Sequence, residues 1–583
     1  MRHTHQNNTL NASMIGETVT LKGFVQKKRD LGNLVFIDLR DFSGIAQLAF
    51  YADNPFKSIT TAIKNEYVLE ATGSVVERDS KNPNLPTGDV EVNVSDLKVL
   101  STAKQPPMII KDETDALEDT RLKYRYLDLR RPVLRDMIKM RHETIKATRD
   151  FLNNQDFFDI DTPILTKSTP EGARDYIVPS RIQKGSFYAL PQSPQLFKQL
   201  LMIGGFEKYY QIAKCFRDED LRSDRQPEFT QIDIEMAFVE EKDVQTLSEG
   251  LIKHIMKETR GIDVKTPFPR LSYDDALRLY GTDKPDMRFG MPIKDLADIF
   301  KATKFKVFKS VLENGGAVQG LHVESGSESL SRKDIDKLGE TVKPYGAKGL
   351  AFIKKNKDAY SGSVAKFLSD SEMDVLNGFM NDGDILLIIA DTLKVTRHSL
   401  GHLRTVLADK LNFIDSDAFD FHWVVHWPMF EYNEGEGRFQ ALHHPFTRPI
   451  DEDKDKLESE PENVYTYGYD LVAQGQELGG GSMRNHNVNV QKQVFNALGL
   501  DKDTQESRFG FFTEALEYGA PPHGGIAFGL ERLVMMLAKT KNIRDVIAFP
   551  KTASATCLLT KAPSEVGEAQ LSDLGIRLKD EKN

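Results

Sequence analysis

Two arginines stand in distinctive and widely separated contexts that suit phosphate binding. Arg217 lies in the segment FRDED, which is followed by PEFTQIDIE, and Arg532 lies in GIAFGLERL. Neither segment contains the GxGxxG or GxxxxGK[ST] pattern of a glycine-rich loop that cradles phosphates with backbone N–H groups. Guanidinium groups bind phosphate oxygens through paired, charge-assisted hydrogen bonds. The two arginines therefore predict a nucleotide site in which side chains neutralise the phosphates.

These signals also have plainer explanations. Arg217 with Glu219 is compatible with a structural ion pair. His443 and His444 are compatible with a surface pair or a chance metal site, and the glycines at 479–481 with a simple turn. Taken one at a time, the residues leave these alternatives open.

The elements that would position a site begin with five short strand-like segments near the N-terminus. They cover residues 18–25, 33–40, 44–51, 67–76 and 89–100 and predict a small barrel. Because side chains alternate along a strand, Val35, Ile37 and Leu39 share the apolar face. Phe36 then lies on the wet face with Asp38 and Arg40.

The wet face of this barrel has the character of a base-stacking platform. The same alternation places Gln47 and Glu91 on the polar side of their strands, so an outward aromatic has hydrogen-bonding neighbours. A scattered surface aromatic, or one that packs on the next domain, explains Phe36 equally well.

The rest of the chain contains two kinds of sequence, one typical of a core domain and one typical of an insertion. A helix is expected over 137–153, then a strand over 157–166 that contains Pro163, then two long antiparallel strands around the FRDED segment. From about residue 286 the sequence is Lys-rich and has a pattern of alternating helices and strands, which indicates an inserted domain. The predicted boundaries are 1–107 for the barrel, 108–136 for a hinge linker, 137–286 and 421–559 for the two parts of the core, 287–420 for the insertion and 560–583 for a C-terminal extension.

Composition limits the classes of protein that fit. The 583 residues carry a formal net charge of -10, which argues against bulk electrostatic binding of nucleic acid, although residues 27–29 and 120–136 are locally basic. A charge run is usually a solvated face. Only two cysteines occur, too few for a disulfide framework and without zinc-site spacing. No apolar stretch approaches the roughly 20 residues of a membrane span, which favours a cytoplasmic protein with no membrane partner.

The quoted segments resemble motifs 2 and 3 of the class II aminoacyl-tRNA synthetases. The helix over 137–153 and the strand with Pro163 resemble motif 1, with Asp156 where the family usually has glycine. Asp tolerates the left-handed backbone conformation that such a glycine adopts. Within the class, six blocks resemble the bacterial-type aspartyl-tRNA synthetases of subclass IIb, nearly end to end: TPEGARDY, YALPQSPQLFKQLLM, RQPEFTQID, ALHHPF, QELGGGSMR and the motif 3 segment. Six blocks in family order outweigh the plainer explanations.

This resemblance implies an α+β multidomain fold and an ATP-dependent ligase. The fold would combine an N-terminal OB-fold barrel that binds the anticodon, a catalytic core built on an antiparallel sheet, and an inserted α/β domain of the type shared with amidotransferase B subunits. The reaction would activate L-aspartate as aspartyl-adenylate and transfer it to the 3′-terminal ribose of tRNA(Asp). It requires positioning and electrostatics more than a general base. The motif 1 elements imply a homodimer.

The resemblance also assigns the nucleotide site. Arg217 and Arg532 are the catalytic arginines, on the α- and γ-phosphates of a bent ATP, and adenine would lie between Phe229 and Arg532. Asp470 and Glu477 would hold Mg²⁺, which prefers oxygen ligands. The full ATP-binding set is Arg217, Asp218, Glu219, Gln226, Phe229, Glu477, Gly529, Leu530, Glu531 and Arg532.

Specificity is assigned in the same way. Arg484, helped by Lys198, would bind the side-chain carboxylate of aspartate, because an amide leaves guanidinium donors unpaired. The full aspartate-binding set is Glu171, Gln195, Lys198, Arg217, Asp233, His443 and Arg484, in which Glu171, Gln195 and Asp233 serve the ammonium group and His443 closes over the substrate. The anticodon set is Arg29, Phe36, Gln47 and Glu91, and Leu31 with Lys81 resemble the form restricted to tRNA(Asp).

Several alternatives accompany this prediction. A relaxed enzyme would also charge tRNA(Asn). A sister enzyme for asparagine or lysine conflicts with Arg484, and a tRNA-independent asparagine-forming ligase conflicts with the N-terminal barrel. A non-catalytic RNA-binding relative would be expected to lose phosphate ligands, yet Arg217, Glu477 and Arg532 are present.

Overall fold

A computed structural model describes residues 3–169, 172–357 and 359–579 of the chain. These residues form two compact units. The first comprises residues 1–141, 221–226 and 541–565, and the second comprises 142–220, 227–540 and 566–583.

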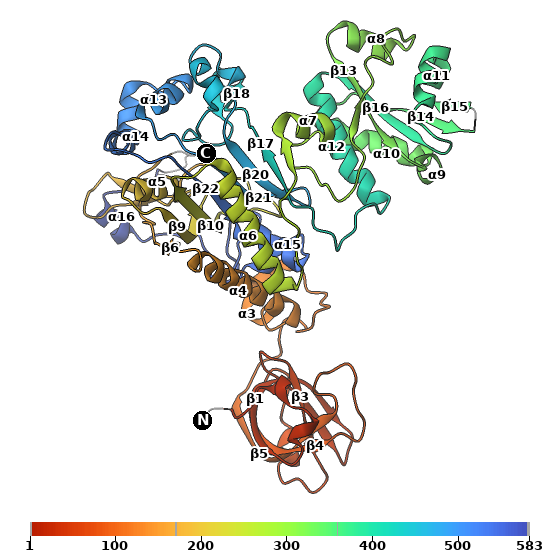
Figure 1. The fold of residues 1–583 in the computed structure, drawn as a ribbon. Helices are drawn as coiled ribbons and strands as arrows, with labels where there is room; N and C mark the ends of the chain where they lie inside the picture. Colours follow the sequence, from red (N-terminus) through yellow and green to blue (C-terminus); the bar gives the residue numbers. More distant parts are fainter. Residues whose placement is uncertain (1–2, 170–171, 358, 580–583) are drawn as a thin grey trace. The chain divides into compact units, whose positions relative to one another are not determined.

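A closed five-stranded barrel dominates the first unit (Figure 1). Its order is β1-β2-β3-β5-β4, in which β3 and β5 run parallel and the other neighbouring strands run antiparallel. The strands are β1 (Thr18–Asp30), β2 (Val35–Arg40), β3 (Ile45–Phe50), β4 (Val68–Glu77) and β5 (Val90–Ser101). The predicted OB-fold barrel and its five strand segments are therefore confirmed.

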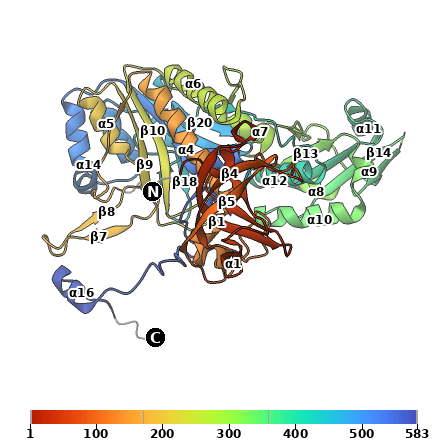
Figure 2. The same ribbon diagram turned by 90° about the horizontal axis from the view of Figure 1, so that it is seen from below.

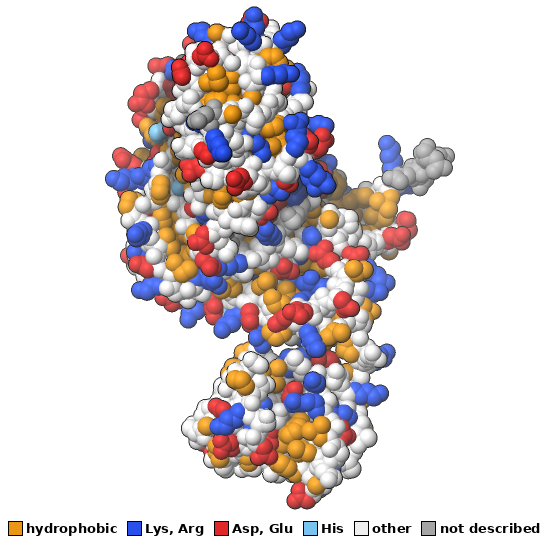
Figure 3. All heavy atoms as spheres, turned by 90° about the vertical axis from the view of Figure 1, so that its right-hand side faces the viewer, with side chains coloured by type: hydrophobic (Ala, Val, Ile, Leu, Met, Phe, Trp, Pro, Cys, Tyr) orange, Lys and Arg blue, Asp and Glu red, His pale blue; other side chains and the backbone are white. Residues whose placement is uncertain are grey.

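The barrel core follows the predicted alternation, but its polar face is less wet than expected. Val35, Ile37 and Leu39 are buried, and Phe36 is half-buried. Arg40, expected on the wet face, is only 3% exposed because its guanidinium pairs with Glu66 at 2.8 Å. Figure 3 shows basic and acidic side chains interspersed on the visible face of the barrel.

An eight-stranded, mostly antiparallel sheet forms the centre of the second unit, in the order β11-β17-β20-β21-β22-β10-β9-β6. Only the outermost pairs, β11 with β17 and β6 with β9, are parallel. The strands are β6 (Phe158–Asp159), β9 (Lys208–Phe216), β10 (Glu228–Ala237), β11 (Arg270–Ser272), β17 (His422–Val425), β20 (Gly468–Ala473), β21 (Gln476–Met483) and β22 (His523–Gly529). The antiparallel core sheet that the sequence predicted is therefore confirmed.

Helices and two small hairpins surround this sheet. Figure 2 shows α5 beside α14 at one end of it, and their side chains share an apolar cluster around Phe446. The helices are α5 (Gln195–Ile203), α6 (Glu241–Arg260), α13 (Val488–Ala497), α14 (Lys502–Glu517) and α15 (Leu530–Ala538), and the hairpins pair β7 (Ile177–Pro179) with β8 (Phe187–Ala189) and β18 (Phe430–Asn433) with β19 (Arg438–Ala441). Helix α16 (Glu568–Leu574) lies apart from the sheet on the C-terminal segment (Figure 2).

The motif 1 region departs from expectation in its strand. Helix α4 (Pro132–Asn153) begins earlier than predicted, at a proline, whose missing N–H is tolerated in the first helical turn. The strand expected over 157–166 is only the two residues of β6, which ends four residues before Pro163. Asp156 does adopt the left-handed conformation, with φ 61°.

The insertion folds around its own five-stranded sheet, in the order β12-β13-β16-β14-β15. One face packs against α10 and α12 and the other against α8 and α11, so the sheet has an apolar cluster on each side (Figure 1). The strands are β12 (Ile293–Asp295), β13 (Ala317–Val323), β14 (Ala351–Asn356), β15 (Ala359–Gly362) and β16 (Ile385–Asp391), and the helices are α8 (Lys306–Glu313), α10 (Arg332–Val342), α11 (Asp370–Asn377) and α12 (Leu393–Lys410). The predicted domain boundaries themselves remain predictions.

Candidate functional site

One face of the eight-stranded sheet gathers polar side chains around a floor of small residues. Residues directly opposite one another on neighbouring strands point to the same face. One such row runs across the sheet from β9 to β20 through Gln211, Asp233, Ala527, Gly480 and Asp470. The next row runs through Tyr209, Glu235, Gly525, Ser482 and Gly468. Carboxylates thus flank the central strands β21 and β22, whose residues in these two rows have small side chains or none.

The small floor is a steric requirement. A Cβ at Gly525 would lie 2.1 Å from Glu235 Oε2, so only glycine leaves room for that carboxylate. A Cβ at Gly480 would lie 2.9 Å from Asp470 Oδ1 and 3.3 Å from Glu477 Oε1. The glycines of QELGGGSMR are therefore strand residues that clear the site, and the simple-turn explanation is wrong.

Two cations and two carboxylates form a buried cluster on one side of this floor. Lys198 Nζ, from α5, lies 2.5 Å from Asp233 Oδ1 and 3.2 Å from Glu235 Oε2. Arg484 Nε and Nη2, just after β21, donate to the two oxygens of Glu235 at 2.9 and 3.1 Å. None of the four residues is more than 2% exposed. Because each charge faces an opposite one, the cluster tolerates this burial.

The pKa values of the two acids in this cluster are shifted in opposite directions. Burial raises the pKa of Asp233, which has Lys198 as its main counter-charge. Burial also acts to raise the pKa of Glu235, but Arg484 and Lys198 together outweigh it and the pKa falls. Glu235 therefore stays ionised and holds the Arg484 guanidinium in place.

The outer end of the Arg484 guanidinium also has partners. Its Nη1 donates to Ser482 Oγ at 2.7 Å and lies 2.6 Å from His444 Nε2. Burial lowers the pKa of His444 well below its usual value, so this ring is neutral and accepts from Arg484. Sequence reasoning assigned no role to Glu235 or Ser482. Alternation along FTQIDIE offered a signal, since Glu235 shares a strand face with Asp233.

Arg217 and Phe229 lie together at the end of the β9–β10 pair. The Arg217 Cζ atom is 5.1 Å from the centroid of the Phe229 ring, a cation–π contact. Among the described residues, the buried Nε of Arg217 has no hydrogen-bond partner. A buried guanidinium N–H without a partner is costly, which favours a ligand at this point.

A second acidic group lies across the floor. His443 Nε2 is 3.4 Å from Asp470 Oδ1, and within the described part of the chain neither atom has a hydrogen bond of good geometry. Arg532 Nη1, from the first turn of α15, is 3.8 Å from Glu477 Oε2 and 3.2 Å from the Glu477 carbonyl oxygen. Burial raises the pKa of Asp470 well above its usual value, and repulsion from the Glu477 carboxylate adds to this shift. Burial lowers the pKa of His443 to about 4.

The other predicted site residues occupy varied places. Gln195 lies at the start of α5 and donates through Nε2 to Gln199. Asp218 faces Arg174 at 3.6 Å, and Glu219 is half-buried in the loop after β9. Glu171 lies outside the described residues.

The motif 3 segment is buried or half-buried throughout. Gly529 ends β22 and is half-buried, whereas Leu530 is fully buried. The Glu531 carboxylate accepts from the backbone N–H of Thr230 at 2.9 Å and so ties α15 to β10. Gln226 belongs to the first unit, where its side chain pairs with the Lys551 backbone at 2.8 and 3.1 Å.

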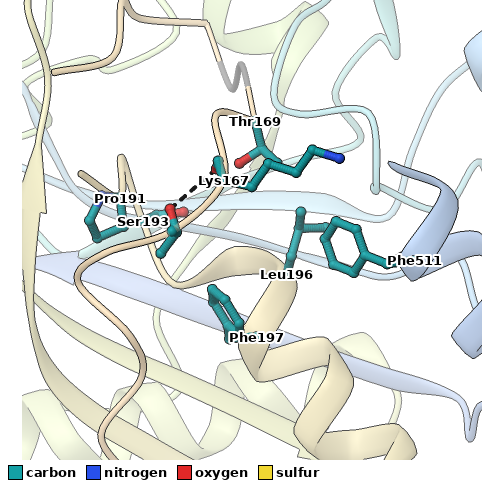
Figure 4. Close-up of a pocket in the computed structure, with 8 residues that line it drawn as sticks. Lys167, Thr169, Pro191, Ser193, Leu196, Phe197 and Phe511 are labelled. Atoms are coloured by element: carbon teal, nitrogen blue, oxygen red, sulfur yellow. Dashed lines mark hydrogen bonds between the residues drawn. The ribbon is translucent and has the colours of Figure 1, made fainter. Parts of the chain in front are cut away.

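A separate small pocket lies beside the start of α5 (Figure 4), where Leu196 and Phe511 face each other. Its described lining includes none of the predicted site residues, although Ser193 and Leu196 flank Gln195 in the sequence. The lining is Thr166, Lys167, Thr169, Pro191, Ser193, Leu196, Phe197 and Phe511.

The barrel brings its four predicted residues into one network. The Arg29 Cζ atom is 5.5 Å from the centroid of the Phe36 ring, and its Nη2 donates at 2.8 Å to both Asp38 and Gln47. Gln47 Nε2 in turn donates to Glu91 at 2.5 Å. Gln47 and Glu91 are buried, 6% and 4% exposed, contrary to the wet face expected from alternation.

Of two buried or partly buried residues that the sequence did not single out, Tyr51 joins this network and Arg78 does not. Tyr51 donates to Glu91 Oε1 at 2.9 Å, and burial together with Glu91 raises the pKa of Tyr51 to about 12. Arg78 is 5% exposed and its Nη2 has no hydrogen-bond partner among the described residues. Leu31 is 68% exposed, and Lys81 pairs with Glu77 at 2.9 Å.

Comparison with known proteins fits this arrangement. The family model "tRNA synthetases class II (D, K and N)" matches residues 117–553, and the model "OB-fold nucleic acid binding domain" matches residues 19–100. The chain belongs to the class II tRNA synthetases of this D, K and N group.

Curated relatives cover almost its whole length. It is 54% identical to "Aspartate--tRNA(Asp/Asn) ligase" of Anoxybacillus flavithermus, with 99% of this chain and 98% of that protein covered. It is also 54% identical to "Aspartate--tRNA ligase" of Bacillus licheniformis, with 97% of each covered. The predicted family is confirmed.

Solved structures agree on the fold. An asparaginyl-tRNA synthetase from Pyrococcus horikoshii, complexed with asparaginyl-adenylate, matches with a TM-score of 0.60 at 19% identity, over 95% of this chain and 99% of that one. An aspartyl-tRNA synthetase from Entamoeba histolytica matches with a TM-score of 0.56 at 20% identity, over 94% and 91% of the two chains. Across the described residues, no helix combines the length and apolar character that crossing a bilayer requires.

Proposed function

We propose that this protein is an aspartate–tRNA ligase that activates L-aspartate with ATP and transfers it to the 3′-terminal ribose of an aspartate tRNA. The relatives that are 54% identical over nearly the whole chain carry this activity in their names. The observation that carries the proposal within the molecule is the buried Arg484 guanidinium, held by Glu235 at 2.9 and 3.1 Å beside Lys198.

Arg484 and Lys198 supply the selectivity for an acidic side chain. Glu235 occupies the edge of the guanidinium formed by Nε and Nη2, which leaves the Nη1–Nη2 edge for a substrate carboxylate. A carboxylate accepts from both nitrogens of that edge, whereas the –NH₂ of asparagine would face a donor with a donor. One of the required N–H groups now faces His444, so aspartate displaces this ring when it binds.

The adenylation step needs cations near the phosphates more than an acid or base. The α-carboxylate of aspartate attacks the α-phosphorus of ATP, the bond to the β-phosphate oxygen breaks, and pyrophosphate leaves. Arg217 neutralises the α-phosphate and Arg532 the γ-phosphate, and Phe229 supports adenine. The buried Nε of Arg217 without a described partner and the position of Arg532 over β21 support these assignments. Transfer follows when the ribose hydroxyl attacks the adenylate carbonyl and AMP leaves, with the adenylate phosphate as proton acceptor.

The residues also fit a magnesium ion beside the phosphates. Asp470 Oδ1 is buried without a hydrogen bond of good geometry among the described residues, and Glu477 Oε1 approaches the same Gly480 position. Asp470 and Glu477 would hold the ion, whose charge would offset that of the triphosphate and reverse the raised pKa of Asp470. In the described chain no group of three or more acidic, His or Cys side chains could hold a metal ion by itself, so Asp470 and Glu477 would need phosphate or water oxygens as further ligands.

The barrel binds the anticodon. Phe36 supplies a stacking surface, and Arg29, Gln47 and Glu91 supply a donor–acceptor row beside it. Leu31 and Lys81 favour an enzyme restricted to tRNA(Asp), while a curated relative named for tRNA(Asp/Asn) supports the relaxed alternative. Charging assays with purified tRNA(Asp) and tRNA(Asn) distinguish the restricted enzyme from the relaxed one. We expect charging of tRNA(Asp) alone, and equal charging of both tRNAs would contradict the restricted form.

Two copies form a homodimer through the motif 1 region. Edge strand β6 presents Phe158, 60% exposed, with Phe206 at 41% in edge-to-face contact. Such an apolar edge suits burial against a second copy. An active monomer in sedimentation would contradict this assembly. The cytoplasmic location expected from the sequence stays a prediction.

A pyrophosphate-exchange assay with single amino acids tests the whole proposal. Exchange should require ATP and L-aspartate and should be negligible with asparagine or lysine. Exchange with asparagine or lysine but not aspartate would replace this function with that of a sister enzyme. Absence of exchange with every amino acid would favour a non-catalytic RNA-binding relative.

A further inference from the structure

A chain of three buried polar side chains lies behind Gln195. Gln195 Nε2 donates to Gln199 Oε1 at 2.9 Å, one turn further along α5. Gln199 Nε2 is 3.1 Å from His523 Nε2 at the start of β22. His523 Nδ1 is 2.7 Å from the Pro521 carbonyl oxygen. Gln199 and His523 are fully buried and Gln195 is 6% exposed, so water does not substitute for these partners.

The chain has a fixed direction. A carbonyl oxygen only accepts, so the His523 proton must lie on Nδ1. Burial lowers the pKa of His523, which keeps the ring neutral and leaves Nε2 as an acceptor. Gln199 must then point its NH₂ at His523 and its carbonyl oxygen at Gln195. Gln195 in turn commits its NH₂ to Gln199, which leaves its own oxygen as the free end.

We propose that the His523–Gln199 pair is a positioning relay that fixes the Gln195 amide with its oxygen toward the ammonium group of bound aspartate. This inference rests on the proposed function and on the family resemblance that assigns Gln195 to that ammonium. An inverted Gln195 would present NH₂ to NH₃⁺, and two donors repel. The histidine tautomer therefore determines, through two amides, whether this contact attracts or repels the substrate.

Two substitutions at Gln199 separate a relay from a merely structural network. Gln199→Met keeps the approximate length but removes both polar ends, so the Gln195 amide loses its orientation. Gln199→Glu keeps an acceptor toward Gln195, and its second oxygen accepts from a His523 that has gained a proton on Nε2. A purely structural role predicts the opposite ranking, because a buried apolar residue is tolerated better than a buried carboxylate.

The experiment measures the KM for L-aspartate and for ATP in pyrophosphate exchange, and the inhibition constant of succinate, which lacks the ammonium group. Losing one charge-assisted hydrogen bond should raise the aspartate KM of Gln199→Met about 10- to 100-fold, with the ATP KM and the succinate constant within about twofold of wild type. Gln199→Glu should raise the aspartate KM less than Gln199→Met. A larger rise in Gln199→Glu, or a succinate constant that rises in parallel with the aspartate KM, would overturn the relay.

A second pair keeps the test decisive if Gln199→Met does not fold. His523→Gln retains an acceptor toward Gln199, and His523→Leu removes it, so the leucine variant should show the larger rise in aspartate KM. Equal values in the two variants would overturn the relay. Wild-type exchange with aspartate is measured in the same series; its absence would refute the proposed function, whereas normal wild-type exchange with the wrong ranking would refute the relay alone.

Discussion

Substituting Glu235 by glutamine tests whether this buried carboxylate holds the proposed specificity arginine. The change keeps the shape of the side chain and removes its charge. An amide oxygen can still accept from one Arg484 nitrogen, but the NH₂ group then faces the second Arg484 donor or Lys198. The variant therefore leaves a buried guanidinium with half of its bidentate contact.

The structure sets the expected magnitude. Unit charges about 3 Å apart interact with roughly 5 kcal/mol at an effective dielectric constant of 20, and removing one partner of a buried pair costs about 3–5 kcal/mol. Glu235 is 0% exposed, so we expect a loss near the lower bound of about 3 kcal/mol in the free energy of unfolding, because one hydrogen bond survives. If the Arg484 guanidinium is displaced by about 1 Å, the rate falls about 100-fold. We therefore expect kcat/KM for aspartate to fall by about this factor in Glu235→Gln.

Urea unfolding followed by tryptophan fluorescence measures the stability of the relevant unit. Trp423 and Trp427, the only two tryptophans, both lie in the second unit. Glu431→Gln is the matched control, because Glu431 pairs with Lys394 at 3.3 Å but is 60% exposed and should change little. If Glu235→Gln and Glu431→Gln give the same urea midpoint and the same kcat/KM for aspartate, Glu235 does not organise the site.

Three further predictions concern other parts of the chain. Arg484→Leu should abolish aspartate-dependent pyrophosphate exchange while equilibrium dialysis still detects ATP binding, and normal aspartate use would disprove the specificity argument. Tyr51→Phe removes a hydrogen bond to Glu91 and should raise the KM for tRNA about fivefold without altering pyrophosphate exchange; unchanged charging kinetics would show that Tyr51 does not orient Glu91. Burial acts to raise the pKa of Asp384, but backbone N–H donors and His322 outweigh it, so Asp384 stabilises the fold above pH 3.8 and this contribution disappears as the pH falls through the lowered pKa. Hydrogen exchange should therefore show weaker protection of β13 and β16 in Asp384→Asn at pH 7, with a difference that shrinks below pH 3.8; a pH-independent difference would argue against the carboxylate.

The sequence predicted what depends on local periodicity. Alternation along 35–39 placed Val35, Ile37 and Leu39 inside the barrel, and hydrophobic patterns identified β9 and β10. The same periodicity failed for Gln47 and Glu91, because burial of a polar side chain depends on partners from other strands. It also overestimated the strand after Asp156, which pairs over only two residues.

Partnerships across the sheet were beyond sequence reasoning. The contact of Arg484 with Glu235 joins residues 249 positions apart, and only the register of β10, β22 and β21 brings them together. Arg484 was recognised through family resemblance, whereas Glu235 has no chemistry with substrate that would single it out. A residue that acts by holding another becomes visible only when its neighbours are known.

The charge balance of the cluster explains how a buried cation can favour an acidic ligand over its amide. Lys198 and Arg484 face Asp233 and Glu235, so the cluster is near neutral before substrate arrives and needs no ligand to be stable. The Nη1 group of Arg484 nevertheless has neutral partners, Ser482 and His444. Replacing the neutral imidazole by a carboxylate strengthens that contact, because a charged acceptor binds a guanidinium more strongly than a neutral one. Asparagine offers one neutral acceptor and one repelled donor for the same displacement. Under the proposed function, selectivity for aspartate over asparagine therefore comes from replacing the neutral His444 ring at Arg484 with a charged carboxylate. The total positive charge of the site does not account for it.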